Sequence, residues 1–299
     1  MASVAVAIPN LNGGNYLYET LLSLQEQVIK PDEIVLSDNY STDNSLEIVA
    51  MFPSLNIKIV KPPRFLSMSE NWNFVSNQIK SDWFFLLSND DLLRNTAIKR
   101  LKEIVVGLAT TIGVISFKSE IINEDSKLIL GKFRFGKPKV REEYEFLKQN
   151  IKFLNINAAS VAIKKNWWIE VGQFPTEYAV LHDLVFYQRA IFKCEILESK
   201  EILGRYRIYS NKPNSSARSI LVLKDFQTYE NSDLKRHILK YPDLLECYTS
   251  QKAEESFNVS GWNFRVQHIR LLVLKLTTIG RKIQSIVSHS GFPIRTSKN

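Results

Sequence analysis

The sequence predicts an α/β protein built on a mainly parallel sheet that helices cover on both faces. Short apolar segments alternate with segments of helical periodicity through the N-terminal third of the chain. This alternation is typical of parallel sheets, in which a helix connects each strand to the next. The composition agrees, because 44% of the 299 residues are hydrophobic and 23% are charged, as in a globular protein with a sizeable core.

The first strand and helix are predicted from residues 4–31. The apolar run at 4–8 ends at Pro9 and the turn-forming sequence NLNGGN, as expected for a buried strand that leads into a loop. The next segment, up to Pro31, carries apolar residues at helical spacing: Leu17, Leu21, Leu24 and Val28.

Three further strands are predicted at residues 33–37, 57–60 and 83–87. A helix from about Ser45 to Phe52 separates the first two. A second helix begins near Ser67, which forms a capping-box pattern with Glu70. Each strand except the last is thus followed by a helix, and the last runs into two adjacent aspartates.

The rest of the chain has a different pattern. Short strands with turn signals are expected over 114–135, a helix over 141–150 and another strand over 157–165. After the turn-rich stretch 206–218 the chain reads as helical to about residue 289, with a loose end. The prediction is therefore a sheet domain followed by a C-terminal helical extension.

Polar side chains follow two of the predicted strands. Asp38 and Asn39 come after the second strand, and Asp90 and Asp91 after the fourth. In open α/β sheets ligands bind outside the carboxyl ends of the strands, so we expect these residues to share one rim. Paired carboxylates there suit Mg²⁺, which completes its shell with water and substrate phosphates.

Simpler interpretations of the same residues stay open. The Ser88–Asp91 stretch also fits an Asx turn that caps the next helix. Asp43 reads as a helix cap, and the Asn12-Gly13-Gly14 stretch as a plain turn. The chain has no dinucleotide fingerprint and no Walker-type phosphate loop.

Charge is unevenly distributed along the chain. Of the 39 Lys and Arg residues 17 lie beyond residue 199, against 8 of the 31 acidic residues. Residues 256–299 contain seven basic and no acidic residues, and 266–287 mixes apolar with basic ones. This segment fits peripheral contact with an anionic membrane surface, or a helix packed on the sheet domain with a solvated basic face.

The cellular setting is predicted from what the sequence lacks. No apolar run is long enough for a transmembrane helix, and no secretory signal is visible at the N-terminus. Cys194 and Cys247 lack metal-ligand spacing and read as reduced thiols. We therefore expect a cytoplasmic protein, with the inner face of the plasma membrane as an alternative place for it.

Three ordered motifs resemble those of the inverting glycosyltransferases of family 2, which have the GT-A fold. They are AIPNLNGGNYLYETLLSLQEQ, PDEIVLSDNYSTDNS and NWNFVSNQIKSDWFFLLSNDDLL. A fourth segment, WWIEVGQFPTEYAVLHDLVFYQRA, is similar to the family's Gly-x-Phe segment and the acidic helix that follows it. The resemblance covers roughly residues 4–212 and implies a nucleotide-sugar-binding half (1–110), an acceptor-binding and catalytic half (111–212) and a basic helical extension (213–299).

The resemblance also implies residue roles. Asp183 matches the catalytic base, Asp90 the ligand of a Mg²⁺ or Mn²⁺ ion that meets the donor diphosphate, and Asp38 with Asn39 the residues that read the base. Arg189, six residues after Asp183, matches a family arginine by pattern alone. The implied donor site comprises Pro9, Asn10, Asn12, Asp38, Asn39, Ser88, Asn89, Asp90, Asp91 and Arg189.

This chain departs from the family pattern at four positions. Ser88 replaces the first aspartate of Asp-x-Asp, Asn39 the second member of the base-reading pair, and His182 the Glu before the catalytic Asp. Tyr209 stands where many relatives have His. The implied metal site therefore has fewer charged ligands than the family pattern, with neutral oxygens from Ser88 and Asn89 beside one carboxylate.

The functional hypothesis is transfer of a hexosyl or deoxyhexosyl group from a UDP-, dTDP- or GDP-sugar to a hydroxyl of a glycan or lipid-linked acceptor, in polysaccharide or lipopolysaccharide synthesis. The alternative is a catalytically impaired sugar-nucleotide-binding protein with the same fold. Nucleic-acid binding is not expected, because its only support is the pI of about 9.3.

Overall fold

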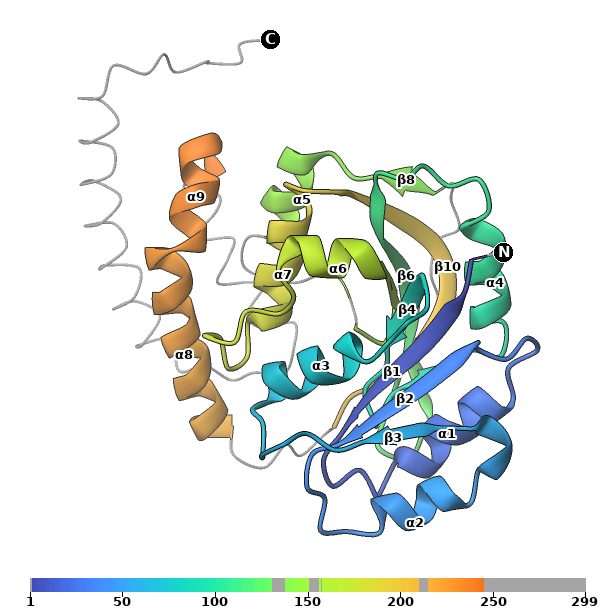
Figure 1. Cartoon of the computed structure of the whole chain (residues 1–299). Coiled ribbons are helices and arrows are strands. Elements are labelled where there is room, and N and C mark those ends of the chain that lie inside the picture. The colour runs from blue at the N-terminus through green and yellow to red at the C-terminus, as the bar shows by residue number, and fades with distance from the viewer. Residues whose placement is uncertain (1, 131–137, 151–155, 157, 210–214, 245–299) are drawn as a thin grey trace. The chain divides into compact units, whose positions relative to one another are not determined.

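The computed structural model describes residues 2–130, 138–150, 156, 158–209 and 215–244 (Figure 1). By internal contacts the chain divides into two units, Met1–Asp233 and Leu234–Asn299. The first contains the sheet and the predicted site, and of the second only residues 234–244 are described.

The N-terminal half follows the predicted alternation of strands and helices. Its elements are β1 (Val4–Asn10), α1 (Leu17–Gln25), β2 (Glu33–Asp38), α2 (Ser45–Ala50), the 3₁₀ helix η1 (Pro53–Leu55), β3 (Lys58–Val60), α3 (Met68–Asn77) and β4 (Trp83–Leu86). β1 pairs in parallel with both β2 and β4, and β2 with β3. The predicted capping box is present, since Ser67 Oγ accepts from the Glu70 N–H and Glu70 Oε2 from the Ser67 N–H.

The second half adds antiparallel strands to this sheet. Its elements are β5 (Leu92–Leu93), α4 (Ala97–Ile104), β6 (Ile112–Ile122), β7 (Leu128–Leu130), β8 (Lys139–Val140), α5 (Glu143–Asn150), η2 (Ala158–Ser160), β9 (Val161–Lys164), α6 (Lys165–Val171), α7 (His182–Ala190), β10 (Glu195–Arg207) and α8 (Ser215–Asn231). The strand order is β3-β2-β1-β4-β9-β6-β10-β5, and β9 is antiparallel to both of its neighbours.

Two strands differ from the sequence prediction. β6 is one continuous strand of 11 residues where several short ones were expected. β10, with 13 residues, was not predicted. The polar sequence Glu198-Ser199-Lys200-Glu201 interrupts its apolar pattern, and the pairing of β10 with β6 shifts register between Glu198 and Gly204. Such irregularities remove the alternation by which strands are recognised.

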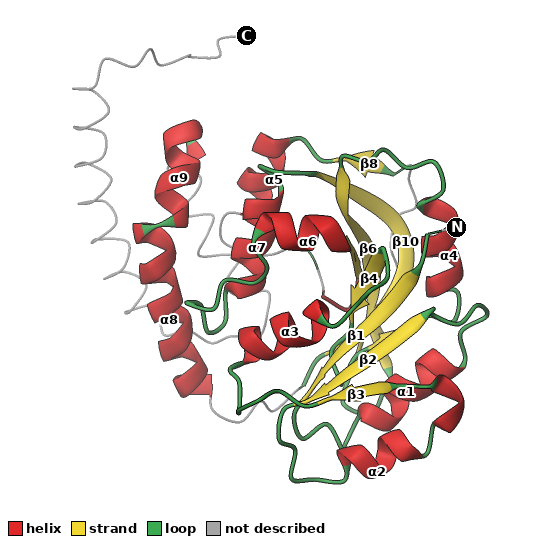
Figure 2. Cartoon of the chain, viewed as in Figure 1, coloured by secondary structure: helices red, strands yellow, loops and turns green. Residues whose placement is uncertain are grey.

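Both faces of the sheet are covered (Figure 2). On one side α1, α2 and α4 bury a cluster that includes Val4, Val6 and Ile8 of β1. On the other side α3, α6 and α7 pack over an aromatic group around Trp168, whose ring lies 4.9 Å from that of Phe186 and 5.0 Å from that of Phe174. Because no face of β1 is left to solvent, it is apolar without alternation.

The structure describes only part of the predicted C-terminal helical extension. Helix α8 is followed by α9 (Asp233–Lys240), and residues 245–299, which include the basic segment and Cys247, lie outside the described residues. Among the helices that are described, none combines the length and the apolar character needed to cross a bilayer. Cys194 is a buried free thiol.

Candidate active site

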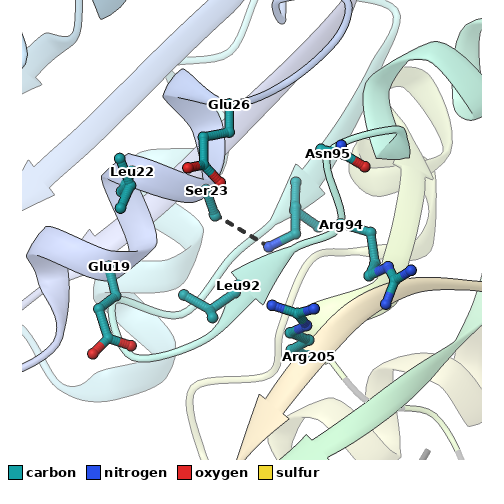
Figure 3. A pocket seen from close by; sticks show the side chains of 9 residues that line it. Glu19, Leu22, Ser23, Glu26, Leu92, Arg94, Asn95 and Arg205 are labelled. Carbon is teal, nitrogen blue, oxygen red and sulfur yellow. Dashed lines mark hydrogen bonds between the residues drawn. The ribbon is translucent and has the colours of Figure 1, made fainter.

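A pocket of about 400 Å³ lies between α1 and β5 (Figure 3). Glu19 of α1 and Glu26, the residue after its end, line one side, and Arg94 with Arg205 the other. The two arginines also bind Glu120, whose pKa they lower against the opposing effect of burial. None of the residues predicted for the donor site lines this pocket.

The ends of β1, β2 and β4 bring three predicted residues into one hydrogen-bonded row. Asn10 faces Asp38 in the parallel register of β1 and β2. The Asn10 amide nitrogen donates to Asp38 Oδ1 at 3.3 Å and to Ser41 Oγ at 3.1 Å, while its oxygen accepts from Asn89 Nδ2 at 2.8 Å. Both Asn10 and Asp38 are buried. The carboxylate of Asp38 is therefore oriented at the rim where the sequence places the donor base.

Asn39 is engaged with a neighbouring segment of the chain. Its side-chain nitrogen donates to the Leu66 carbonyl at 2.9 Å, and its oxygen accepts from the Leu66 N–H at 2.9 Å. The amide thereby fixes the segment before α3 against the end of β2. Reading of a base by Asn39 stays a prediction, and the contacts show a supporting role that the sequence did not indicate.

The Asn12-Gly13-Gly14 turn ties the first rim loop to the second. Asn12 has a φ of 50°, and its side chain accepts from the Thr42 N–H at 2.8 Å. A Cβ on Gly13 would lie 2.4 Å from Asn10 Oδ1, so only glycine fits beside the polar row. The Gly14 N–H donates to Asp43, whose pKa is lowered by hydrogen bonds from Ser45 and Gly14 in spite of the opposing effect of burial. The contacts of Asn12-Gly13-Gly14 agree with the simpler interpretation of that stretch as a turn. The residue at the N-cap of α2 is Asn44, whose side chain makes no capping bond, so the predicted cap Asp43 lies one position earlier and accepts from the Ser45 N–H at 3.0 Å.

The two aspartates after β4 have different surroundings. Asp90 is partly exposed and accepts a hydrogen bond at 2.6 Å from the hydroxyl of Tyr209. Burial, and then this bond, raises the pKa of Tyr209, so the phenol stays protonated and donates. Asp91 is buried, and its Oδ1 accepts from the backbone N–H of Arg207 at 2.9 Å. Asp90 is thus the more exposed of the two aspartates, and Asp91 supports the loop.

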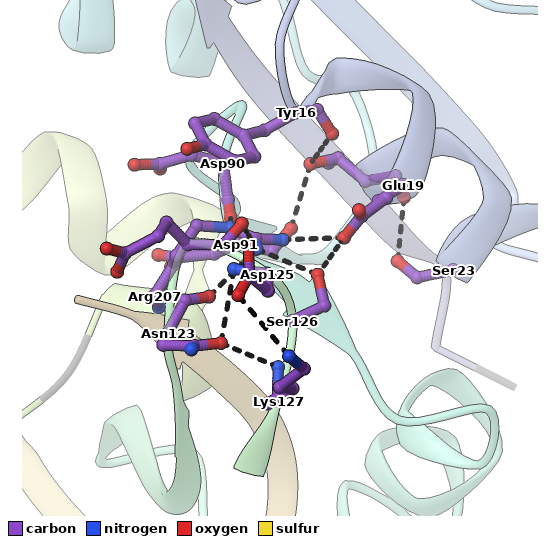
Figure 4. Close-up of polar contacts among 12 residues, drawn as sticks. Tyr16, Glu19, Ser23, Asp90, Asp91, Asn123, Asp125, Ser126, Lys127 and Arg207 are labelled. Atoms are coloured by element: carbon purple, nitrogen blue, oxygen red, sulfur yellow. Dashed lines mark hydrogen bonds and ion pairs between the residues drawn. The ribbon is translucent and has the colours of Figure 1, made fainter. Parts of the chain in front are cut away.

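Arg207, at the end of β10, was not singled out by the sequence (Figure 4). Its side chain is fully buried, and Nε donates to the Asp90 carbonyl at 2.8 Å. Nη2 pairs with Glu19 at 2.7 Å, and the guanidinium lies 4.5 Å from the centre of the Tyr16 ring. A basic residue two positions before Tyr209 was the available signal, but nothing local indicated that it is buried.

Asp183 lies in the first turn of α7, where the helix N-terminus favours a negative charge. Its Oδ1 accepts from the Leu184 N–H at 2.7 Å. The chain before the helix is held by Asp225 of α8, which accepts from the N–H groups of residues 179–181. The start of α7 is therefore fixed by a carboxylate from a distant helix.

Helix α3 links this helix to the strand ends. The ring of His182 lies 6.3 Å from that of Trp72 on α3 and 5.0 Å from that of Phe174. The same α3 begins next to the Leu66 segment that Asn39 holds. Packing contacts therefore run from His182, the residue before Asp183, to α3, whereas the described hydrogen bonds of Asp183 itself reach none of the predicted donor-site residues.

Arg189 lies in the last turn of α7 and has other partners. Its Nε and Nη2 bind the two oxygens of Asp233 at 2.8 and 2.9 Å, and Nη2 also contacts Glu177 at 3.2 Å. The hydrogen bond to Asp233 raises the pKa of Arg189. In the described residues its hydrogen bonds and ion pairs are all with these two carboxylates, so a donor-binding role for Arg189 stays a prediction without a contact that supports it.

Asp90 fits a divalent cation that a diphosphate helps to hold. The hydroxyl of Tyr209 donates to Oδ2 of Asp90. Among the residues that the structure describes, none forms a hydrogen bond to Asp90 Oδ1. Within those residues, no three His, Cys, Asp or Glu side chains could hold a metal by themselves. Since Mg²⁺ commonly takes one or two carboxylates and completes its shell with water and phosphates, one carboxylate oxygen with Ser88 and Asn89 in the same loop suits such an ion.

The family model described as glycosyl transferase family 2 matches residues 5–164, more than half of the chain. The chain belongs to this family. The match includes the strand ends with Asn10, Asp38 and Asp90, and it ends before α7. The predicted resemblance is confirmed, and the mixed α/β sheet is the GT-A fold that it implied.

Solved structures of TarS from S. aureus have a similar fold. The complex of TarS 1-349 with UDP-GlcNAc matches 72% of this chain and 61% of its own, with a TM-score of 0.59 and 18% identity. The complex with UDP matches 74% and 65%, with a TM-score of 0.55 and 17% identity, and a longer TarS chain matches 69% and 37%, with a TM-score of 0.55 and 18% identity. The chain therefore spans less than two thirds of the length of each. No curated protein matches it in sequence.

Proposed function

We propose that the protein is an inverting glycosyltransferase that moves a sugar from a nucleoside diphosphate sugar to a hydroxyl of a glycan or lipid-linked acceptor. The observation that carries the proposal is the row at the strand ends, in which a buried Asp38 and a partly exposed Asp90 flank Asn10 and Asn89 in a family 2 chain. The proposed role is in cell-surface polysaccharide synthesis at the inner face of the plasma membrane.

The donor base lies next to Asp38 in this proposal. A carboxylate only accepts hydrogen bonds when ionised, and a uracil or thymine ring offers an N–H donor on its edge. UDP-sugars, dTDP-sugars and GDP-sugars are the candidates. The TarS structures with UDP and UDP-GlcNAc support testing the uridine donors first.

The diphosphate lies near Asp90. Asp90, with Ser88 and Asn89, would hold a Mg²⁺ or Mn²⁺ ion between the loop and the phosphates. Such an ion supplies Lewis-acid stabilisation of the charge that develops on the leaving diphosphate. The hydroxyl of Tyr209 orients the carboxylate of Asp90, because its hydrogen bond fixes one of the two oxygens.

Asp183 serves as the general base. The acceptor oxygen attacks the anomeric carbon while the bond from that carbon to the diphosphate oxygen breaks, and Asp183 takes the proton of the attacking hydroxyl. The reaction inverts the anomeric configuration in one displacement and needs no covalent intermediate. A positioned base of this kind contributes about 100- to 10,000-fold to the rate.

The test begins with binding and continues with turnover. A panel of nucleotide sugars is screened by thermal shift with and without Mn²⁺, and the stabilising donors are assayed with lipid-linked acceptors. Asp183→Asn should lower turnover about 100- to 10,000-fold while leaving donor binding intact. A variant that transfers sugar at the wild-type rate contradicts the assigned base.

A second candidate function is sugar-nucleotide binding without catalysis. Ser88 in place of an aspartate, and the Tyr209 hydroxyl on Asp90, favour it, because both reduce the number of charged oxygens available to a cation. Tight donor binding with neither hydrolysis nor transfer in the presence of Mn²⁺ would select this candidate.

Membrane contact through the basic segment is a separate part of the proposal. Removal of the residues after Gly261 should reduce the fraction of protein that sediments with anionic vesicles. Unchanged partition would contradict the anchoring role and leave the proposed chemistry untouched.

A further inference from the structure

The end of β10 and the residues just after it contact the Asp90–Asp91 loop through three hydrogen bonds, and Figure 4 shows Arg207 beside both aspartates. The Arg207 N–H donates to Asp91 Oδ1 at 2.9 Å, and Arg207 Nε donates to the Asp90 carbonyl at 2.8 Å. The Tyr209 hydroxyl donates to Asp90 Oδ2 at 2.6 Å. Because the Ile208 N–H still bonds to Ile122, residues 207–209 continue along β6. One extended segment thus holds both the backbone and the side chains of the loop.

The remaining donors of Arg207 end on two other segments. Nη1 donates to the Asn123 carbonyl at 3.1 Å and to Ser126 Oγ at 2.8 Å, both in the turn between β6 and β7. Nη2 pairs with Glu19 of α1. The guanidinium therefore joins α1, the loop after β4 and the β6–β7 turn, which are far apart in sequence.

Charge pairing alone does not explain this arrangement. Glu19 is the one carboxylate among the partners of the Arg207 side chain in the described chain, and the other acceptors are carbonyl and hydroxyl oxygens. Burying a charge is unfavourable, and apolar packing often stabilises a fold as well as a buried ion pair does. What apolar packing lacks is a set of directed bonds, and those of Arg207 fix the backbone of Asp90.

We infer that Arg207 is a positioning residue for Asp90. By fixing the loop backbone while Tyr209 fixes the carboxylate, it sets the direction in which the other oxygen of Asp90 faces the donor diphosphate and its cation. The inference rests on the proposed function, since it assigns Arg207 to that same site. Arg207 itself does not touch the donor.

Arg205 provides a control on the same strand for the loss of a guanidinium, with a side chain that is 43% exposed where that of Arg207 is fully buried. It lies two residues earlier, and its Nε binds Glu120 at 2.8 Å much as Arg207 binds Glu19. It lines the pocket between α1 and β5 and makes no hydrogen bond to Asp90 or Asp91 among the described contacts (Figure 3). Replacing each arginine by lysine therefore removes a guanidinium in both proteins and the loop contact in only one.

Two measurements on the full-length R207K and R205K proteins test the inference. Hydrogen–deuterium exchange of residues 88–91 is followed without ligand, and UDP affinity is measured by calorimetry with Mn²⁺. R207K should speed exchange in this loop and weaken UDP binding at least about tenfold, because the donor bond from a charged group to the Asp90 carbonyl is lost. Its turnover should fall about 100-fold, the effect expected of a small displacement in a catalytic site.

R205K should stay within about twofold of the wild type in affinity, as is usual for changes in partly exposed ion pairs. Tyr209→Phe is the second variant. If R207K does not fold, unchanged UDP–Mn²⁺ binding in Tyr209→Phe overturns the inference that this segment positions Asp90. This second variant keeps the aromatic ring, which lies 5.5 Å from that of Tyr16, and removes the hydroxyl that binds Asp90. It should weaken UDP–Mn²⁺ binding about three- to tenfold.

The possible results separate the inference from the proposed function. A wild-type protein that binds no nucleotide or nucleotide sugar contradicts the proposed function. A wild-type protein that binds, together with R207K and R205K that behave alike, overturns the positioning role alone. Unchanged exchange of residues 88–91 in R207K overturns it as well, as does faster exchange with undiminished UDP affinity.

Discussion

Arg189 and Arg207 are both bound to carboxylates, but their surroundings differ. Both carboxylate oxygens of Asp233 accept hydrogen bonds from the guanidinium of Arg189, and the Arg189 side chain is 24% exposed. Arg207 is fully buried and distributes its donors over three segments, mostly to neutral oxygens. The two-point pair ties the last turn of α7 to one carboxylate, that of Asp233. The distributed bonds of Arg207 to backbone carbonyls instead fix the shape of a loop.

Loss of Asp233 should have the largest effect on stability. Asp233→Ala leaves Arg189 without its two-point partner and Tyr178 without its carboxylate acceptor, so the free energy of unfolding should fall by about 3–5 kcal/mol. Urea denaturation measures the change. Glu177→Ala, which removes the exposed partner of Arg189, should cost less than about 1 kcal/mol. Weaker UDP binding in Asp233→Ala, without a loss of stability, would instead point to the predicted donor role of Arg189.

A substitution of Asp38 tests the polar row at the strand ends, which belongs to the same proposed donor site as Arg207. Asp38→Ala removes a charged acceptor at the proposed base, so the affinity for UDP should fall by about 1.5–3 kcal/mol. Calorimetry with UDP and with inorganic diphosphate separates the base from the phosphates, and only UDP should lose affinity. Equal losses for both ligands would place the base elsewhere.

Glu198 is a stabilising group on the same strand as Arg207. Burial alone would raise its pKa, but hydrogen bonds from Lys118 and Lys200 and the charge of Arg141 hold it at about 2. Because the folded pKa lies below the unfolded value of about 4.3, the stabilisation is complete above pH 4.3 and disappears as the pH falls through 2. Glu198→Gln should lower stability by about 1–2 kcal/mol at pH 7, with the difference shrinking below pH 4.

Thermal or urea unfolding across this pH range checks the Glu198 prediction. UDP affinity at pH 7 should be unchanged, since Glu198 contacts neither Asp90 nor Asp91 in the described structure. A difference from the wild type that persists unaltered to pH 2 would show that the carboxylate charge is not its source.

Ser67 gives the smallest expected effect. Ser67→Ala removes the side chain that caps α3, which should cost about 1 kcal/mol of stability. Because α3 lies between the Leu66 segment and His182, a slight loss of UDP affinity should accompany it. Asn77→Ala, near the other end of α3, is the control. It removes only an exposed hydrogen bond to Gln173, so it should change stability by less than about 0.5 kcal/mol and leave UDP affinity unchanged.

The sequence predicted the parts of the fold and site that depend on neighbouring residues. The strands β1–β4 were recognisable because each apolar run ends at a turn, and Ser67 with Glu70 marked the start of α3. Asp38 and Asp90 could be assigned to one rim, because parallel strands place their carboxyl ends together.

The remaining features depend on partners that are distant in sequence. The acceptor for Arg189 is Asp233 on α9, and nothing near Arg189 indicates it. Asn39 has the residue type of a base-reading group, yet its amide is bound to Leu66 through a loop whose path the sequence does not specify. Arg207 lies on β10, whose apolar pattern is interrupted by polar residues and by shifts of register. Neither the strand nor the burial of Arg207 was therefore predicted.

The hydrogen bond between Arg207 and Asp90 joins residues that are 117 positions apart. During translation the ribosome adds about 5–20 residues per second, so the loop after β4 waits roughly 6–23 s for the segment that orders it. A nascent chain therefore carries the complete strand ends β1 to β4 well before it has an ordered aspartate loop. Premature termination anywhere before β10 would release a partial sheet without the hydrogen bonds from Arg207 and Tyr209 to Asp90.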